Sequence, residues 1–375
     1  YNWLREYLDF NAQPDELSSV LTSLGLEVED VEEWVSVKGG MKGVVIGRVL
    51  TCERHPDADR LSVTTVDAGG TEPLHIVCGA PNVAAGQVVA VALPGTMVFH
   101  GNEQFEIRKS KIRGQLSEGM ICAEDELGLG NDHEGIMVLD GNARIGMPAA
   151  EYFGVTTDTI FEIGLTPNRI DCSSHFGVAR DLAAFYNLRR PVRAKLPEIA
   201  GFSKDRDRGV INVTVEAPDA CIRYSGLTVR GIKVGPSPAW LQTRLRAIGL
   251  NPINNVVDIT NFVLHETGQP LHAFDASAIT GDTVRVRHLP DKTKFVTLDG
   301  VERTLSSSDL MICNRDEGMC IAGVFGGLRS GVTEATTDLF LESATFSPVS
   351  VRRTSRRHDL HTDASYRFER GTDPE

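Results

Sequence analysis

The sequence predicts an α+β protein with several domains: a small α/β domain split by an inserted β-barrel, then a second mixed α/β module. Three observations predict this class. A chain of 375 residues is long enough for two or three domains. Residues 41–147 contain short β-prone runs between Gly and Pro turns, at the close spacing of a small barrel. Helical patterns lie on both sides of that segment, in residues 1–40 and 148–193, and again in residues 210–375.

The split domain, residues 1–40 and 148–193, is expected to contain two main helices and a strand. Pro14 begins the first helix and Gly25 ends it, and residues 26–37 follow as a strand. Asp171 is expected to cap the second helix, which ends before Pro191. In the barrel, residues 41–147, the expected strands are 44–49, 61–66, 74–77, 88–93 and 136–139.

A charged linker, residues 194–209, is expected before the second module, residues 210–375. One helix of this module is expected to have Ser237 as its N-cap and Pro238 as its first residue, and another to run from Asp258 to Gly268. The remaining expected elements are strands at 211–215, 224–229, 283–286, 294–298, 310–313 and 320–324, and a last helix at 347–356.

Composition excludes several classes of protein. Lys and Arg number 38 and Asp and Glu 51, so the net charge of −13 disfavours non-specific coating of nucleic acid but leaves a local basic patch open. Seven cysteines without a C-x-x-C pair suit the reduced thiols of a cytoplasmic protein. No apolar run reaches the roughly 18 residues of a membrane span, so no membrane association is expected. Because the chain begins at Tyr1 and stops at Glu375 just after an Arg-rich stretch, we expect both ends to be trimmed.

Two groups of cations are candidates for phosphate contact. The first lies in the barrel and consists of Arg108, Lys109, Lys111 and Arg113. Acidic residues nearby also allow a plain solvated hairpin, which charge alone favours. The second contains Arg352, Arg353, Arg356 and Arg357, whose alternative is a solvated helix end, where cations are favoured.

Polar residues mixed with apolar ones in the second module predict either a site or a braced loop, because buried polar groups need partners. They occur in residues 254–262 and 269–275. His272 could act on a substrate or be held by Asp275. Glu342, in an apolar run, is either a paired structural acid or an acceptor in a pocket. His358 and His361 could bind a metal, but without further ligands we expect no metal site.

Four motifs of the barrel, in order, resemble the tRNA-binding OB-fold module of several synthetases: residues 55–59, 76–82, 111–114 and 117–122. Residues 254–261, 269–275, 326–327, 341–342 and 362–371, with 166–169 upstream, are similar to the β subunit of bacterial phenylalanine–tRNA ligase. The resemblance covers the whole chain and implies an N-terminal fragment: a split domain, an inserted OB-fold and an editing module of the B3/B4 type.

The resemblance implies two activities. The whole enzyme makes phenylalanyl-tRNA(Phe) from ATP, Phe and tRNA with Mg²⁺, as a heterotetramer of two α and two β subunits. The editing module hydrolyses mischarged tyrosyl-tRNA(Phe), which is useful because an apolar pocket rejects an added hydroxyl only about a hundredfold. The rival hypothesis is a non-catalytic scaffold that docks tRNA and supports the α subunit. A scaffold needs no carboxylate that distinguishes Tyr from Phe, so Glu342 separates the two hypotheses.

The resemblance also implies residue roles. Glu342 would accept a hydrogen bond from the tyrosine phenol, and His272 and Thr362 would complete the catalytic group. The substrate-binding residues would be Thr260, Asn261, Pro270, Gly326 and Ala364, and the tRNA-binding residues Arg108, Lys109, Lys111, Arg113, Arg352 and Arg356. No cofactor is implied for the fragment itself. Phe325 and His361 depart from the family's usual pattern.

Overall fold

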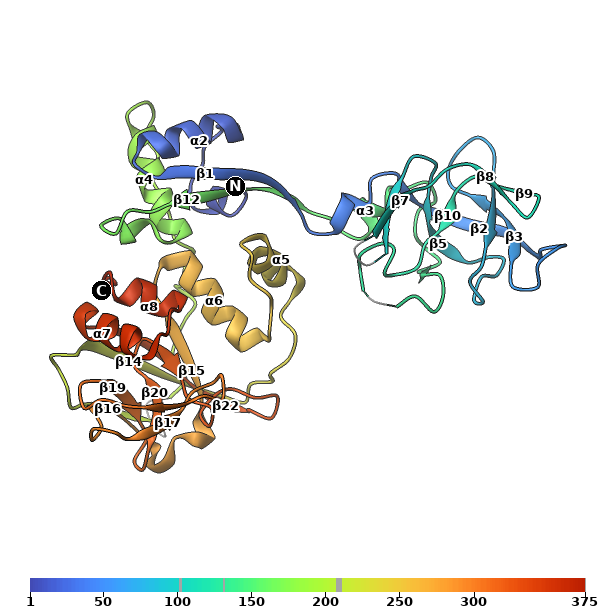
Figure 1. The fold of residues 1–375 in the computed structure, drawn as a ribbon. Helices are drawn as coiled ribbons and strands as arrows, with labels where there is room; N and C mark the ends of the chain where they lie inside the picture. Colours follow the sequence, from blue (N-terminus) through green and yellow to red (C-terminus); the bar gives the residue numbers. More distant parts are fainter. Residues whose placement is uncertain (101–102, 131, 207–210, 375) are drawn as a thin grey trace. The chain divides into compact units, whose positions relative to one another are not determined.

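The computed structural model describes residues 1–100, 103–130, 132–206 and 211–374, and the chain forms two compact units (Figure 1). One unit comprises Tyr1–Glu32 with Thr159–Glu375, and the other Glu33–Asp158. In the described parts of the chain, no helix has the length and apolar character needed to cross a membrane. The seven cysteines are unpaired with one another in the structure, and all but the half-buried Cys52 are buried.

The unit Glu33–Asp158 is built on an antiparallel sheet that curls into a nearly closed barrel. The order of its strands is β10-β5-β2-β3-β4, with β11 also beside β5. A hydrogen bond of 2.7 Å from the Glu118 amide to the His75 carbonyl brings the segment before β10 to β4, which narrows the open edge. The bounds are β2 Val44–Arg54, β3 Ser62–Asp67, β4 Leu74–Cys78, β5 Val88–Ala92, β10 Met120–Ile121 and β11 Val138–Leu139.

The five strands expected for the barrel are therefore confirmed, but two hairpins were missed. They are β6 Met97–His100 with β7 Glu103–Glu106, and β8 Ser110–Ile112 with β9 Gln115–Ser117. All residues of β7 and most of β8 are exposed, so these strands lack the buried alternation that predicts a strand. A short helix, α3 Ala149–Tyr152, follows the barrel.

The first helices of the chain are α1 Leu4–Tyr7 and α2 Pro14–Ser23, and Gly25 ends α2 in the left-handed region, as predicted. The expected strand is β1 Glu27–Val35, which pairs with β12 Thr157–Gly164, a strand not predicted. The expected second helix is α4 His175–Asn187. Its predicted cap was wrong: the Ser174 hydroxyl accepts from the Gly177 amide at 3.1 Å, whereas Asp171 pairs with Arg169.

Residues 211–374 contain two sheets that enclose one apolar core, with Phe274, Phe340 and Phe346 almost fully buried. The larger sheet has the order β13 Asn212–Val215, β16 Thr283–His288, β19 Leu310–Cys313, β20 Gly318–Ile321 and β21 Phe325–Gly326. The smaller has the order β14 Cys221–Arg230, β22 Asp338–Phe346 and β15 Leu271–Asp275. A hairpin, β17 Lys294–Val296 with β18 Glu302–Thr304, completes the strands described there. All strands expected in this module are present, but β15, β18, β21 and β22 were missed.

The module's helices are α5 Ala239–Ala247, α6 Asn255–Thr267, α7 Pro348–His358 and α8 Asp363–Phe368. Helix α5 begins one residue later than predicted, because the Ser237 hydroxyl donates to Asp258 rather than capping the helix. Helix α6 begins three residues earlier, because the Asn254 side chain accepts from the amides of Val256 and Val257. Its end at Gly268 was predicted correctly. Helix α7 fits the expected last helix, but α8 follows it.

Candidate functional site

A cavity of about 450 Å³ lies between α6, the smaller sheet, the loop after β20 and the start of α8. Figure 1 shows α6 and α8 beside the ends of β14 and β15. The cavity is lined by every catalytic and substrate-binding residue that the resemblance implies: Thr260, Asn261, Pro270, His272, Gly326, Glu342, Thr362 and Ala364. Most of the other lining side chains are apolar, among them Val257, Leu264, Leu298, Phe325, Val332 and Phe368.

Strand register places two ionisable residues of the cavity, Glu342 and His272, side by side. Glu342 on β22 faces His272 on β15 and Gly226 on β14. A Cβ atom at Gly226 would lie 2.2 Å from Cζ of Phe340, so any larger residue would displace that ring. Gly226, on the strand opposite Glu342, therefore leaves room for the Phe340 ring.

Glu342 is a buried acid whose side chain has one hydrogen-bond partner, Tyr224, in the described part of the chain. Its side chain is almost fully buried, and its Oε2 atom accepts a hydrogen bond of 2.9 Å from the Tyr224 phenol. Burial raises the pKa of Glu342 to about 8, although the Tyr224 hydrogen bond opposes that rise. No other hydrogen bond to Glu342 occurs in the described part of the chain, so Oε1 is available to a ligand in the cavity.

His272 presents a neutral imidazole. Burial of the ring lowers its pKa to about 4, so it carries no charge at neutral pH. Its Nε2 atom is shielded and has no hydrogen-bond partner among the described residues. The ring packs edge-to-face on Phe274 at 4.5 Å and against Gly326, where a Cβ atom would lie 3.0 Å from Cε1. The expectation that Asp275 holds His272 was wrong, since Asp275 accepts instead from Ser277 and Thr336.

The hydroxyl groups of the lining are already used within the fold. Thr362 caps α8 by accepting from the Ser365 amide at 3.0 Å, and it donates to the Val324 carbonyl at 3.0 Å. It thereby fixes the loop after β20 to the start of α8. Thr260 donates to the Val257 carbonyl at 2.7 Å, one turn back along α6. Both side chains shape the wall of the cavity.

The polar residues at the start of α6 brace the loop rather than line the cavity. Asn255 accepts from the Gly235 amide at 3.2 Å and donates to the Lys233 carbonyl at 2.9 Å. Asp258 is fully buried and accepts from the Ile253 amide and the Ser237 hydroxyl. Both alternatives for this stretch are therefore realised. Asn254, Asn255 and Asp258 hold the loop before α6 and the start of the helix, whereas Thr260 and Asn261 line the cavity.

The cations of the barrel divide into paired and unpaired ones. Arg108 forms an ion pair with Glu106 at 2.6 Å, and Lys109 with Glu118 at 3.0 Å. Lys111 and Arg113 are exposed, and we find no ion pair for either within the described residues. The charge of Lys109 is thus balanced by an acidic neighbour, as expected for a solvated hairpin. Lys111 and Arg113 are available to bind a phosphate.

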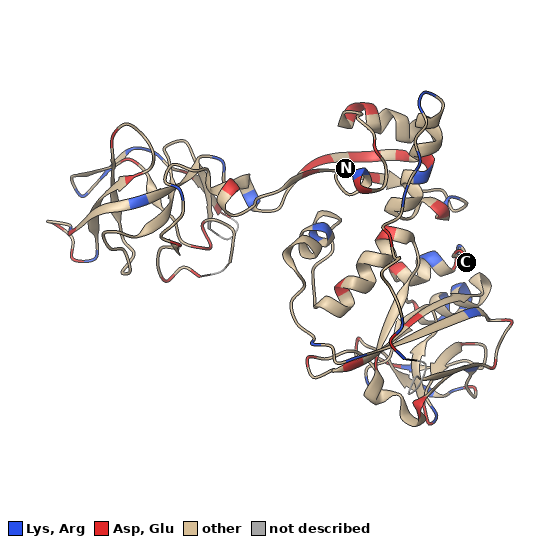
Figure 2. Ribbon diagram, turned by 180° about the vertical axis from the view of Figure 1, so that it is seen from behind, with Lys and Arg blue, Asp and Glu red and all other residues tan. Residues whose placement is uncertain are grey.

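The cations of α7 divide in the same way, and Figure 2 marks them in blue. Arg357 forms an ion pair with the fully buried Asp309. Arg352 and Arg356 are exposed and have no ion-pair partner in the part of the chain that the structure describes. The hydroxyl of Thr354 and the Nε2 atom of His358 also bind Asp309.

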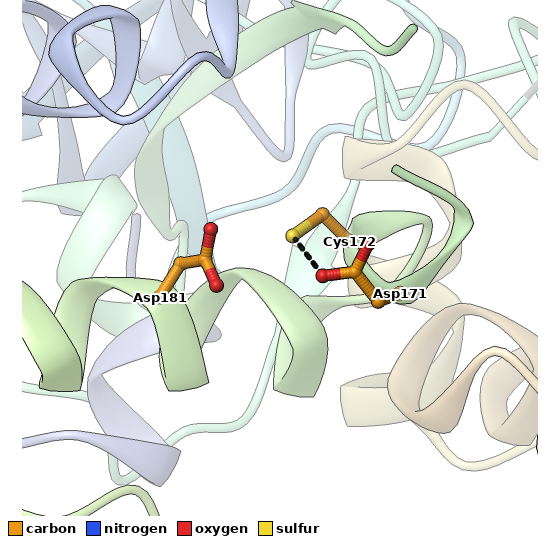
Figure 3. Close-up of side chains that lie close together, drawn as sticks. All are labelled: Asp171, Cys172 and Asp181. Atoms are coloured by element: carbon orange, nitrogen blue, oxygen red, sulfur yellow. Dashed lines mark hydrogen bonds between the residues drawn. The ribbon is translucent and has the colours of Figure 1, made fainter. Parts of the chain in front are cut away.

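Asp171, Cys172 and Asp181 lie close together, with potential ligand atoms within 4.8 Å of one another (Figure 3). The Arg169 guanidinium already fills this cluster. It donates to Cys172 Sγ at 2.8 Å and to Asp171 at 3.2 Å, and also to Asp181. Burial raises the pKa of the Cys172 thiol to about 12, so the sulfur is a poor metal ligand at neutral pH. The three side chains therefore serve as acceptors for the Arg169 guanidinium.

Sequence reasoning missed two residues that organise the module of residues 210–375, namely Tyr224 and Asp309. Tyr224 lies 118 positions from Glu342, and Asp309 lies 48 positions from Arg357. Alternation around Tyr224 predicted a strand but not its partner. No local signal could have found either contact, because each depends on how distant segments pack.

Comparison with known proteins now identifies the family. The chain is 58% identical over its full length to the phenylalanine–tRNA ligase beta subunit of Bacteroides thetaiotaomicron. The chain belongs to the phenylalanine–tRNA ligase beta-subunit family. Other beta subunits of this family are 58% identical, from Porphyromonas gingivalis, and 48% identical, from Salinibacter ruber. The chain spans 46% of the length of each of these three relatives.

Two domain families match parts of the chain. Residues 44–148 match the family "Putative tRNA binding domain", which covers the barrel. Residues 220–375 match the B3/4 domain, which contains the cavity. The two matched regions coincide with the two places where the structure has candidate sites.

Proposed function

We propose that this chain acts within a phenylalanine–tRNA ligase as the part that hydrolyses tyrosyl-tRNA(Phe). The observation that carries the proposal is the buried Glu342, whose Oε1 atom has no partner among the described residues while the carboxyl group lines an apolar cavity. A tyrosine phenol can bind that oxygen and a phenylalanine ring cannot. A site that hydrogen-bonds a hydroxyl rejects the analogue without it by about 10⁴-fold or more.

The ring of the substrate would lie in the apolar part of the cavity, between Pro270, Gly326 and Leu298. Its phenol would reach Glu342. The ester would lie toward Thr362 and Ala364, at the start of α8, with Thr260 and Asn261 on the opposite wall. These contacts would hold the carbonyl carbon in place for a water molecule, which is the main contribution expected from positioning.

Hydrolysis needs a water oxygen to bond to the ester carbonyl carbon, and the bond from that carbon to the ribose oxygen to break. The water gives up a proton and the ribose oxygen gains one, so tyrosine and free tRNA leave. With a pKa of about 4, His272 is a weak base at neutral pH. We therefore assign it the orientation of the water or ester through its Nε2 atom, which has no partner among the described residues. The free hydroxyl of the terminal ribose would take the proton from the water and pass its own proton to the departing ribose oxygen.

For the remaining parts we propose a division at the expected boundaries. Residues 41–147 would form an OB-fold that binds tRNA, inserted into the domain of residues 1–40 and 148–193. Residues 194–209 would link it to the editing module of residues 210–375. The tRNA assignment is supported by the barrel match and by Lys111 and Arg113, which are exposed and have no ion-pair partner among the described residues. Arg352 and Arg356 offer a second basic surface.

The whole enzyme would make phenylalanyl-tRNA(Phe) from ATP, Phe and tRNA(Phe) in the cytoplasm, together with an α subunit in a heterotetramer of two α and two β subunits. ATP and Mg²⁺ would serve the synthetic site. The sequence of this chain contains no G-x-x-x-x-G-K-[ST] loop. We therefore assign nucleotide binding to other parts of that assembly.

Calorimetric binding of free tyrosine and phenylalanine, followed by deacylation of tyrosyl-tRNA(Phe), tests the editing proposal. We expect tyrosine to bind more tightly, and Glu342→Ala to abolish the preference and slow deacylation at least a hundredfold. Asp338→Ala, on the same strand but outside the cavity lining, is the matched control. Equal binding of the two amino acids to the unaltered chain, with no deacylation, would favour the scaffold instead.

A further inference from the structure

Tyr224 contacts Glu342 from outside the cavity. It is not among the lining residues, yet its phenol lies 2.9 Å from Oε2 of Glu342. On the antiparallel pair β14 and β22, Tyr224 faces Ala344 and Gly226 faces Glu342. Tyr224 and Glu342 are thus diagonal neighbours on one face of the sheet, and Gly226 places no side chain between them.

The hydrogen bond from Tyr224 restricts the rotation of the Glu342 carboxyl group. The last torsion of a glutamate side chain is broad, so a carboxyl group with no partner can rotate. Here the Tyr224 ring is itself held, stacked on Phe340 with ring centroids 6.5 Å apart and planes 15° apart. A fixed phenol therefore binds one carboxyl oxygen, while Oε1 has no hydrogen-bond partner among the described residues.

We propose that Tyr224 is the positioning residue for substrate selection: its phenol holds one oxygen of Glu342 so that the other is presented to the phenol of a tyrosyl substrate. The proposal rests on the editing function above. Glu342 would accept two phenol hydrogen bonds, one resident and one from the ligand. A phenylalanyl group leaves the second oxygen without a donor, which disfavours its binding.

Tyr224 also affects the charge of Glu342. Burial raises the pKa of Glu342 to about 8, and the hydrogen bond from Tyr224 opposes that rise. The other titratable groups near Glu342 do not change charge near neutrality. The pKa of His272 is lowered to about 4, and burial raises the pKa of Cys221 to about 12 and that of Cys320 well above its usual range.

Two further groups complete the surroundings. Burial raises the pKa of Tyr224 well above its usual range, so its phenol remains a donor. Asp363, on α8 in the lining, is paired with Arg367 at 3.2 Å. A change of affinity with pH between about 6 and 9 that occurs for tyrosine and not for phenylalanine, which carries the same amino group, therefore reports on Glu342, whose ionised form is the stronger acceptor.

Tyr224→Phe tests the proposal, since it keeps the ring and removes only the phenol oxygen. We expect tyrosine affinity to fall about tenfold with phenylalanine affinity unchanged. We also expect the pH midpoint of tyrosine binding to move to higher pH, because the hydrogen bond that lowers the pKa of Glu342 is lost. Tyr186→Phe is the matched control, because the buried Tyr186 hydroxyl has no partner among the described residues.

The double variant Tyr224→Phe with Glu342→Gln separates positioning from general damage to the fold. If Tyr224 acts through Glu342, the double variant loses no more tyrosine affinity than Glu342→Gln alone. Additive losses, or a Tyr224→Phe protein with unchanged preference and midpoint, would overturn the inference and leave the editing proposal standing. Absence of any tyrosine preference in the unaltered chain would contradict the editing proposal itself.

Discussion

Glu342 and Asp309 are both buried acids of the same module, and they have opposite surroundings. Glu342 accepts one hydrogen bond, from Tyr224, and burial raises its pKa to about 8. Asp309 accepts from the Ser306 amide at 2.8 Å and from four groups in all, three of them on α7.

The surroundings reverse the sign of the pKa shift. Burial acts to raise the pKa of Asp309, but hydrogen bonds from the Ser306 amide, His358 and Thr354, with the charge of Arg357, hold it below its usual range. An acid that fixes a helix has its acceptor positions filled by the fold. An acid that selects a ligand keeps one of them open, and the fold bears the resulting electrostatic cost.

The largest effect that tests this comparison is expected for Asp309→Ala. Removing the acid leaves Arg357 and the largely buried His358 without their partner, so the free energy of unfolding should fall by about 3 kcal/mol or more. Urea denaturation measures it. Glu302→Ala, at an exposed ion pair with Lys294, is the control, with an expected change below about 0.5 kcal/mol. A loss as small as that of the control would contradict a structural role for Asp309.

Glu342→Gln should change the free energy of unfolding in the opposite direction and stabilise the protein at high pH. The pKa of Glu342 is raised from 4.5 to about 8 in the folded protein, so between these values the folded state binds more protons than the unfolded state. Stability therefore falls as pH rises through this window. Gln carries no proton and avoids the loss, so the variant should unfold like the unaltered chain at pH 4 and be more stable above pH 8, by roughly 5 kcal/mol for a pKa raised from 4.5 to about 8.

Urea denaturation at several pH values measures that gain. Asp299→Asn is a suitable control, because hydrogen bonds from Thr297 and Arg303 lower the pKa of this exposed acid. A stability difference between Glu342→Gln and the unaltered chain that did not vary with pH would show that Glu342 stays ionised in the fold, and the comparison with Asp309 would fail.

The two acids also show how far sequence reasoning reaches. The end of α6 at Gly268 could be predicted because a left-handed glycine is a local signal. The start of α6 was placed at Asp258, since an acid in a first turn suits a helix start, yet that acid is committed to Ser237 and Ile253. Which of two polar residues caps a helix depends on packing that the local pattern does not contain.

The cavity lining was predicted only because its motifs resemble a known family. Periodicity alone did not predict β15 and β22, the strands that carry His272 and Glu342, since both strands interrupt apolar runs with polar residues. The contact of Tyr224 with Glu342 depends on strand register across 118 positions. Register is a property of the folded sheet, so neither propensity nor motif could supply this contact.

The smallest effects are expected on α7, where Arg357 and Arg356 are neighbours with different surroundings. Arg357 pairs with Asp309 but is 38% exposed, so Arg357→Ala should lower the free energy of unfolding by only about 1 kcal/mol. Arg356 has no ion-pair partner in the described residues, so Arg356→Ala should leave stability unchanged within about 0.5 kcal/mol.

Binding of tRNA(Phe) at several salt concentrations distinguishes the roles of Arg356 and Arg357. If Arg356 contacts a phosphate, its loss reduces the slope of log affinity against log salt by about 1, whereas Arg357→Ala leaves the slope unchanged because that cation is committed to Asp309.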